Sequence, residues 1–151
     1  MGAFSCVKGA SAGEGLGNKF LSHIREVDAI VHVVRCFDDA NIIHVDGTVD
    51  PLRDIDTIDL ELILSDLESV KKRLEKAEKY VKTGEKSYIE EAELLRKLND
   101  TLESGKPIRS LKLTDDEKAM TDGFFLITSK PVLYCANIGE NDIGQSHASS
   151  M

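Results

Sequence analysis

The pattern of hydrophobic and polar positions changes type several times along the chain, and each change marks an expected element. After a loop rich in glycine and serine, apolar residues at helical spacing predict a helix that starts near Gly15–Leu16 and ends near Glu26–Val27. The β-branched run Ala29–Arg35 then predicts a buried strand. A second short apolar run, Lys130–Ala136, predicts another buried strand near the C-terminus.

From Thr57 onward the apolar residues follow a heptad repeat. About three heptads of this kind predict a coiled-coil helix. Gly84 lies in a polar break that suits a helix end, and a second periodic run extends from Ile89 to Leu102. Because one amphipathic helix cannot bury its apolar stripe alone, we expect the two helices to pack as an antiparallel hairpin. The two expected seams of the first helix are Leu60, Leu67, Leu74 and Val81, and Ile63, Val70 and Ala77.

The remaining segments read as connections. Residues 36–55 are polar and rich in turn signals, and residues 108–113 suggest an extended connector. Thr114 and Glu117 have the spacing of a capping box, which predicts a helix reaching about Leu126. The polar residues 141–151 predict a disordered tail.

These elements predict an α/β fold with an inserted helical hairpin. The strand that follows each helix suggests that the two strands are parallel neighbours, joined by a right-handed crossover into which the hairpin is inserted. We therefore divide the chain into a sheet domain (residues 1–56 and 105–140), an inserted coiled-coil hairpin (residues 57–104) and a tail (residues 141–151).

Composition narrows the classes of partner. The chain has 151 residues with a net charge of −8, so as a whole it repels nucleic acid and anionic membranes. No apolar run approaches the ~20 residues of a membrane span, and no signal segment is evident, so we expect a cytoplasmic protein without a membrane partner. The four histidines lack metal-ligand spacing, and we assign no metal site.

A glycine-rich stretch between Gly13 and Phe20 imitates a phosphate-binding loop but fails its requirements. Lys19 does not follow a loop glycine at the required spacing, and Phe20 offers no hydroxyl group for Mg²⁺. Ser11 and Ser22 have no plausible base and acid partners for a hydrolytic triad. We therefore assign no catalytic residue.

A basic cluster on the hairpin offers a possible partner contact. Lys71, Lys72, Arg73 and Lys76, followed by further lysines, are expected to gather toward the hairpin tip. Such a surface could meet RNA phosphates or an acidic protein. The alternative is a solvated coiled-coil exterior with i,i+4 ion pairs.

Three stretches carry a resemblance to a known family. They read VKGASAGEGLGNKFLSHIREVDAIVHVVRCF, DGTVDPLRDIDTIDLEL and SKPVLYCANIGE, and together they cover most of the chain from Val7 to Glu140. The first resembles the segment that follows the switch II motif in the YchF family, the Obg-like ATPases. The resemblance implies a partial P-loop NTPase of the G-domain type, without the family's phosphate-binding loop and TGS domain.

The resemblance also implies a switch II remnant at the start of the chain. The motif's aspartate falls at Gly2, its glycine at Ser5 and its hydrophobic residue at Cys6, and all three depart from the family pattern. The catalytic half-site is therefore missing, and we expect this chain alone to be inactive.

At the other end, Asn137, Ile138 and Glu140 fall at the place of the base-recognition loop, which is usually N-K-x-D in GTPases. Ile138 replaces the lysine and Glu140 the aspartate. A longer carboxylate is poorly placed for guanine, and the family resembled carries N-x-x-E and is associated with ATP in preference to GTP. The alternative is a surface turn after a strand.

The function implied by the resemblance is that of a ribosome-associated protein that binds ATP (and GTP) and hydrolyses ATP with Mg²⁺ as a conformational switch. We expect neither ATP nor Mg²⁺ to bind tightly to this chain, and we expect the ribosome as partner, with a possible RNA contact by the hairpin. A homodimer through an exposed sheet edge is a further possibility. The alternative function is a non-catalytic coiled-coil module that binds a ribosomal or regulatory partner.

Overall fold

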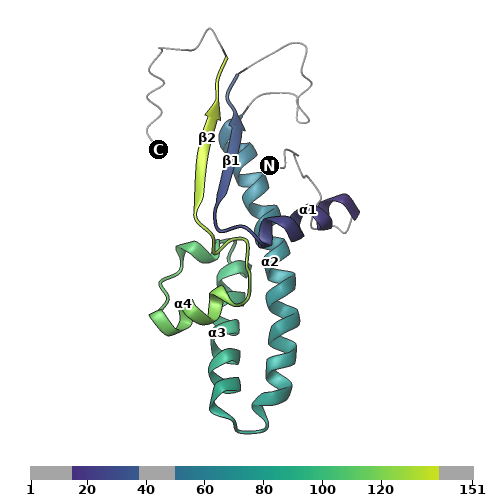
Figure 1. The fold of residues 1–151 in the computed structure, drawn as a ribbon, viewed down its shortest axis with the longest axis vertical. Coiled ribbons are helices and arrows are strands. Elements are labelled where there is room, and N and C mark those ends of the chain that lie inside the picture. Colours follow the sequence, from purple (N-terminus) through teal and green to yellow (C-terminus); the bar gives the residue numbers. More distant parts are fainter. Residues whose placement is uncertain (1–14, 38–49, 140–151) are drawn as a thin grey trace.

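The computed structural model describes residues 15–37 and 50–139. Figure 1 shows the strands at one end of an elongated molecule and a long pair of helices at the other. The elements in chain order are α1 (Gly15–Arg25), β1 (Ile30–Arg35), α2 (Pro51–Val81), α3 (Lys86–Glu103), a 3-10 turn η2 (Ile108–Ser110), α4 (Asp115–Asp122) and β2 (Val132–Asn137).

The two strands form a parallel pair, as predicted. The register runs from Ile30 opposite Val132 to Arg35 opposite Asn137. Backbone hydrogen bonds extend the ladder at its far end, where the Cys36 amide donates to the Asn137 carbonyl at 2.8 Å. Two segments about a hundred residues apart in the sequence therefore end side by side.

The prediction that both strands are buried is wrong for the described residues. Alternate side chains point to opposite faces of a strand. Ile30 packs against α1 and α2, whereas Val31, Val33 and Leu133 leave 61%, 47% and 65% of their surface exposed. Among the described residues, a covering layer lies on one face of the sheet only.

Helix α2 begins at Pro51, six residues before the predicted start at Thr57. Asp50 caps it, because its side chain accepts a hydrogen bond from the Arg53 amide at 3.2 Å, and proline is well suited to the first helical position. The heptad pattern missed this turn because its apolar positions start later. Residues 38–49 of the predicted irregular segment lie outside the described residues.

Helices α2 and α3 pack side by side and form what we call the helical arm (Figure 1). The Lys71 ammonium lies 2.9 Å from the Glu103 carboxylate, and the Arg96 guanidinium lies 3.0 Å from that of Glu78. From Lys71 to Glu78 the residue number rises by seven in α2, while that of the partner in α3 falls by seven, so the two helices run antiparallel. Gly84 turns the chain between them with φ of +77°. The coiled-coil character of the arm stays a prediction.

From Ile63 to Val81 the predicted seam belongs to the buried core of the described residues, and Leu60 is the exception. Val70, Ala77, Leu95 and Leu98 are buried in the arm, but Leu60 leaves 52% of its surface exposed. Since α3 ends opposite Lys71, the first heptad of α2 extends beyond it, and there Ile63 and Leu62 are buried against other segments while Leu60 faces solvent. Placing Leu60 in the seam was therefore wrong.

The segment after the arm differs in detail from the prediction. The expected extended connector contains the 3-10 turn η2. The capping box of α4 is confirmed, because the Thr114 hydroxyl accepts from the Glu117 amide at 3.2 Å and the Glu117 carboxylate accepts from the Thr114 amide at 2.9 Å. The helix ends at Asp122 instead of reaching Leu126, which is fully buried in the core.

A buried carboxylate fixes the base of the arm. Asp66 on α2 is fully buried and accepts hydrogen bonds from the amides of Ile127 (3.0 Å) and Thr128 (2.7 Å) and from the Thr128 hydroxyl (2.7 Å). The Arg25 guanidinium at the end of α1 lies 3.5 Å from the same carboxylate and donates to the Ser65 hydroxyl at 2.8 Å. These contacts join α1, α2 and the segment that leads into β2.

Candidate functional site

The carboxyl ends of β1 and β2 bring together the residues most suited to a ligand. In parallel α/β sheets ligands bind outside these ends, because loops and polar groups converge there. Asn137 ends β2 and is exposed, and the next residue, Ile138, leaves 43% of its surface in water. The two described members of the predicted base-binding set are therefore presented to solvent at the expected end of the sheet.

The end of β1 adds two groups that the sequence pattern did not single out. Arg35 lies opposite Asn137 in the strand register. Its Nε donates to the Phe37 carbonyl at 3.0 Å, and its guanidinium carbon lies 5.0 Å from the centre of the Phe37 ring. A cation held against an aromatic face is a stable arrangement. The sequence signal that could have identified Arg35 and Phe37 was their position at the end of a predicted strand.

The remaining residues of the predicted nucleotide site are not placed by the structure. Glu140, at the end of the base-recognition motif, lies outside the described residues, as do Gly2, Ser5 and Cys6 of the switch II remnant.

The inner face of the sheet rests on a polar layer. Arg109 lies 3.3 Å from both carboxylate oxygens of Asp59, and the Tyr134 hydroxyl donates to one of them at 3.2 Å. Burial, followed by the negative charge of Asp59, raises the pKa of Tyr134. His32 packs against the Tyr134 ring with 5.6 Å between ring centres, and burial lowers the pKa of this imidazole. These groups fix the strands on α2, so we assign them a structural role.

At the strand ends the described residues carry hydrogen-bonding and apolar groups. The described residues 35–37 and 137–139 offer an amide, a guanidinium group and apolar surface, but no carboxylate for Mg²⁺. Within residues 15–37 and 50–139, no group of three His, Cys, Asp or Glu side chains is placed to hold a metal ion. In the same ranges no helix has both the length and the apolar character needed to cross a bilayer.

The basic residues proposed as a partner contact are engaged within the molecule. Lys71 pairs with Glu103, Lys72 pairs with Glu68 at 2.6 Å, and the Arg73 guanidinium lies 5.0 Å above the Phe124 ring. Lys76 is exposed.

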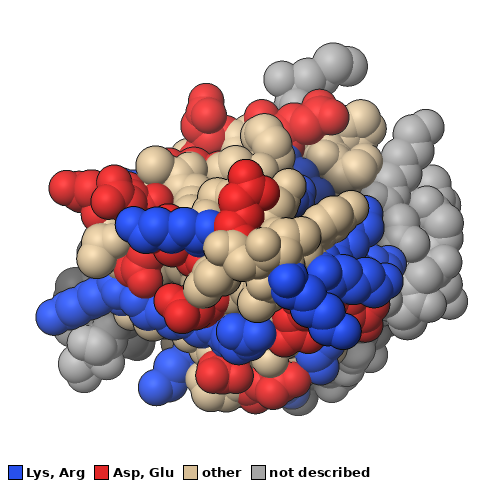
Figure 2. Space-filling model, turned by 90° about the horizontal axis from the view of Figure 1, so that it is seen from below, with Lys and Arg blue, Asp and Glu red and all other residues tan. Residues whose placement is uncertain are grey.

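The expected gathering toward the tip of the arm holds for Lys79, Lys82 and Lys86, which flank the connection between the helices, but not for Lys71. Lys71 lies opposite the last turn of α3, about 15 Å from the connection between the helices, since a helix rises about 1.5 Å per residue. Viewed toward the tip, the surface mixes blue and red side chains without a large patch of one sign (Figure 2).

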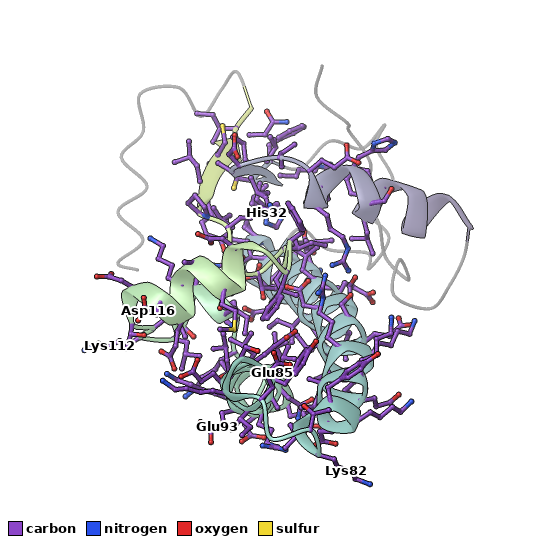
Figure 3. All side chains as sticks on the ribbon, turned by 60° about the horizontal axis from the view of Figure 1, so that its bottom comes forward. His32, Lys82, Glu85, Glu93, Lys112 and Asp116 are labelled. Atoms are coloured by element: carbon purple, nitrogen blue, oxygen red, sulfur yellow. The ribbon has the colours of Figure 1, made fainter. Side chains whose placement is uncertain are left out.

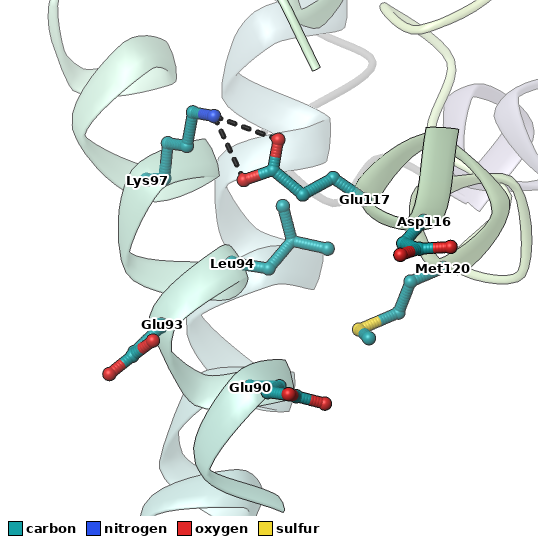
Figure 4. Close-up of a pocket in the computed structure, with 7 residues that line it drawn as sticks. All are labelled: Glu90, Glu93, Leu94, Lys97, Asp116, Glu117 and Met120. Atoms are coloured by element: carbon teal, nitrogen blue, oxygen red, sulfur yellow. Dashed lines mark hydrogen bonds and ion pairs between the residues drawn. The ribbon is translucent and has the colours of Figure 1, made fainter. Parts of the chain in front are cut away.

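A groove between α3 and α4 is a second candidate. Its volume is about 440 Å³, and four of the seven residues that line it are acidic (Figure 4). The Lys97 ammonium lies 2.9 Å from both oxygens of Glu117, and the hydrogen bond from the Thr114 amide, followed by Lys97, lowers the pKa of that carboxyl. This pairing joins α3 to α4. The residues that line the groove are Glu90, Glu93, Leu94, Lys97, Asp116, Glu117 and Met120.

Comparison with known proteins identifies relatives of this chain. No protein-family model matches the chain. A Bacillus subtilis protein named ribosome-binding ATPase YchF is 55% identical over 137 residues, which cover 91% of this chain and 37% of the relative. The Saccharomyces cerevisiae Obg-like ATPase 1 is 51% identical over 140 residues, covering 89% and 36%.

A solved structure of another protein is also similar to this chain. The structure of the Schizosaccharomyces pombe YchF GTPase matches with a TM-score of 0.73 and 44% identity over 90% of this chain and 38% of that one. Together with the parallel strand pair and the long helices, this likeness places the chain in the α/β class of P-loop GTPases. The chain belongs to the YchF/Obg-like ATPase family. It spans 37% of the length of the Bacillus subtilis relative.

Proposed function

We propose that this chain forms the base-recognition side of a nucleotide-binding domain in a P-loop ATPase that works as a conformational switch. In this proposal residues 1–56 and 105–140 belong to a partial nucleotide-binding domain. Residues 57–104 form an inserted antiparallel coiled coil, and residues 141–151, expected from the sequence to be a tail, lie outside the described residues. The packing of α2 on α3 supports the inserted hairpin, and the first turns of α2 also contact β1.

The observation that carries the proposal is the exposed Asn137 at the carboxyl end of a parallel strand, opposite Arg35. At that place an amide side chain can both donate to and accept from the edge of a nucleobase. Ile138 would cover the ring, and the Glu140 carboxylate would accept a hydrogen bond from the amino group of adenine. The names of two relatives, both ATPases, favour ATP, whereas the Schizosaccharomyces pombe relative is named a GTPase, which keeps GTP as a second ligand.

The 151 residues alone should bind nucleotide weakly and should not hydrolyse it. The sequence contains no G-x-x-x-x-G-K-[ST] motif, and Gly2, Ser5 and Cys6 stand where switch II would contact Mg²⁺ and the γ-phosphate. Charge-assisted contacts to phosphate are worth roughly 1.5–3 kcal/mol each. Since about 1.4 kcal/mol is a factor of ten in affinity, losing several of them removes many decades.

Calorimetric titration with ATP and Mg²⁺ tests this account. We expect no tight binding to the 151-residue chain, and binding to a version extended at its N-terminus by a phosphate-binding loop. In the extended protein, Asn137→Ala should weaken ATP binding about tenfold, as expected for one lost hydrogen bond of about 1.4 kcal/mol. CTP, which lacks the purine edge, serves as control ligand. Tight ATP binding by the 151 residues would contradict the proposal.

A second function, a binding module, is favoured by the exposed charged surface of the arm. The relatives named ribosome-binding suggest the ribosome as partner, which would place the protein in the cytoplasm. Lys71, Lys72, Arg73 and Lys76 are the proposed contact residues on α2. Reversing the charge at Lys71, Lys72 and Lys76 should then reduce co-sedimentation with ribosomes, whereas Lys112→Glu, outside the arm, should not. Unchanged co-sedimentation of the triple variant would eliminate this contact.

A further inference from the structure

The end of the helical arm carries an aromatic pair that bridges its two helices. The rings of Tyr80, in α2, and Tyr88, in α3, are stacked with 5.1 Å between their centres and 25° between their planes. Tyr80 nevertheless leaves 53% of its surface exposed. One ring is therefore supported from within the molecule while much of its surface remains open to a ligand.

Lysines lie beside this pair among glutamates, and the flanking Glu78 and Glu90 are paired with Arg96 and Lys86. Residues 79–88 contain Lys79, Lys82 and Lys86 against a single acidic residue, Glu85, whereas the whole chain has a net charge of −8. Lys86 pairs with Glu90 at 3.2 Å. Within the part of the chain that the structure describes, Lys79 and Lys82 make no ion pair, and Figure 3 shows Lys82 pointing away from the end of the arm.

The turn between the helices holds this surface in one shape. The Thr83 hydroxyl and amide both donate to the Tyr80 carbonyl, at 2.7 Å and 2.9 Å, and the Gly84 amide donates to the Val81 carbonyl at 3.0 Å. A ligand that stacks on Tyr80 therefore meets a preorganised platform, which reduces the entropy lost on binding.

We propose that residues 79–88, the arm tip, form a contact site for single-stranded RNA. An unpaired base would stack on the exposed surface of Tyr80, and the ammonium groups of Lys79 and Lys82 would neutralise the adjoining phosphates. An exposed aromatic ring among cationic side chains is how proteins hold unpaired nucleotides, because every base has a face that stacks. An acidic protein surface would satisfy the lysines but has no particular use for the ring, and a duplex hides the faces of its bases.

The inference rests on the proposed ribosome association for its choice of RNA. It goes beyond that proposal by locating a contact at the end of the arm, away from Lys71 and Lys72, and by naming the chemical form of the ligand.

The test uses the whole 151-residue chain and a labelled oligoadenylate of about eight nucleotides, a length within the range of single-strand sites. The protein has three tyrosines and no tryptophan, so two of its three intrinsic fluorophores lie at the arm tip. Binding should raise the anisotropy of the label and quench tyrosine emission. We expect Tyr80→Ala to weaken binding about tenfold and Tyr80→Phe to preserve it.

Charge variants separate stacking from attraction to phosphate. Replacing Lys79 and Lys82 by Gln should weaken binding and lower the slope of log affinity against log salt by about 0.7 for each lysine. Lys112→Gln and Lys118→Gln, which remove two lysines outside the arm, form the matched control and should change neither quantity. Circular dichroism on each variant confirms that the helices remain.

The outcomes separate this inference from the proposed function. Loss of oligonucleotide binding in Tyr80→Ala supports the arm-tip site even where ribosome co-sedimentation is unchanged, a result that counts only against the ribosomal role. Absence of binding, equal affinity for an RNA duplex, or binding that Tyr80→Ala leaves intact overturns the arm-tip site, whatever the ribosome assay gives.

Discussion

Asp66 shows how much of the architecture depends on one side chain. Its two oxygens receive hydrogen bonds from the backbone of Ile127 and Thr128 and face the Arg25 guanidinium. Burial, partly opposed by these hydrogen bonds, raises the pKa of the carboxyl. The site therefore stabilises the fold only as a complete set, because any removed partner leaves a buried polar group unsatisfied.

Asp66→Ala should lower the free energy of unfolding by about 3 kcal/mol, since it leaves two buried amides and a hydroxyl without an acceptor. Urea denaturation followed by circular dichroism measures the change. Asp100→Ala, at an exposed position on α3, is the matched control and should cost less than about 0.5 kcal/mol. Equal effects of the two substitutions would show that the Asp66 contacts do not stabilise the fold.

His32 predicts a pH dependence of stability. Because burial lowers its pKa below the ordinary 6.5, the unfolded chain takes up a proton before the folded chain does as pH falls. The contribution of this group is fully present above pH 6.5 and is lost as pH falls from there through the folded pKa. His32→Gln should flatten the stability profile in that window, measured by urea denaturation at several pH values. A profile as steep in the His32→Gln variant as in the parent chain would contradict this account.

At the scale of elements, the arm depends on a short turn that the sequence identified correctly. Gly84 adopts φ of +77°, which costs any residue with a Cβ atom roughly 1–2 kcal/mol. No other atom lies within 4 Å of where that Cβ would be, so the cost comes from the backbone alone.

Gly84→Ala should therefore lower the free energy of unfolding by about 1 kcal/mol, and Gly84→Asn should cost less because asparagine tolerates this conformation better. Urea denaturation of both variants measures the difference. An alanine variant as stable as the parent chain would mean that the turn rearranges without cost.

At the scale of the whole molecule, the sheet has one uncovered face and two unpaired edges among the described residues. Val31, Val33 and Leu133 are exposed on that face. Apolar residues beside unpaired strand edges favour association with another chain, so the proposed homodimer through a sheet edge has a physical basis.

We expect the chain to self-associate with rising concentration in analytical ultracentrifugation, and Val33→Lys to shift it toward the monomer. Leu52→Lys provides a matched control, because Leu52 is also exposed, at 69%, but lies on α2. A chain that remains monomeric at all concentrations, or equal effects of the two variants, would contradict association through the sheet.

The sequence alone determined the features that depend on local spacing. The two strands, the two long helices, the turn at Gly84 and the capping box at Thr114 follow from periodicity and backbone preference, which act between residues close along the chain. The same patterns placed Asn137 at the end of a strand and, through resemblance, indicated the family.

Only the tertiary structure decided which surfaces meet. It placed Arg35 opposite Asn137 and buried Asp66 against Thr128. It left Leu60 exposed, because α3 ends before reaching it. It also placed Lys71 far from the arm tip, where Tyr80 stacks on Tyr88. These outcomes depend on contacts between segments far apart in the sequence and on where each helix stops. Hydrophobic periodicity gives the face of an element that will be buried, but not the length over which a partner covers it.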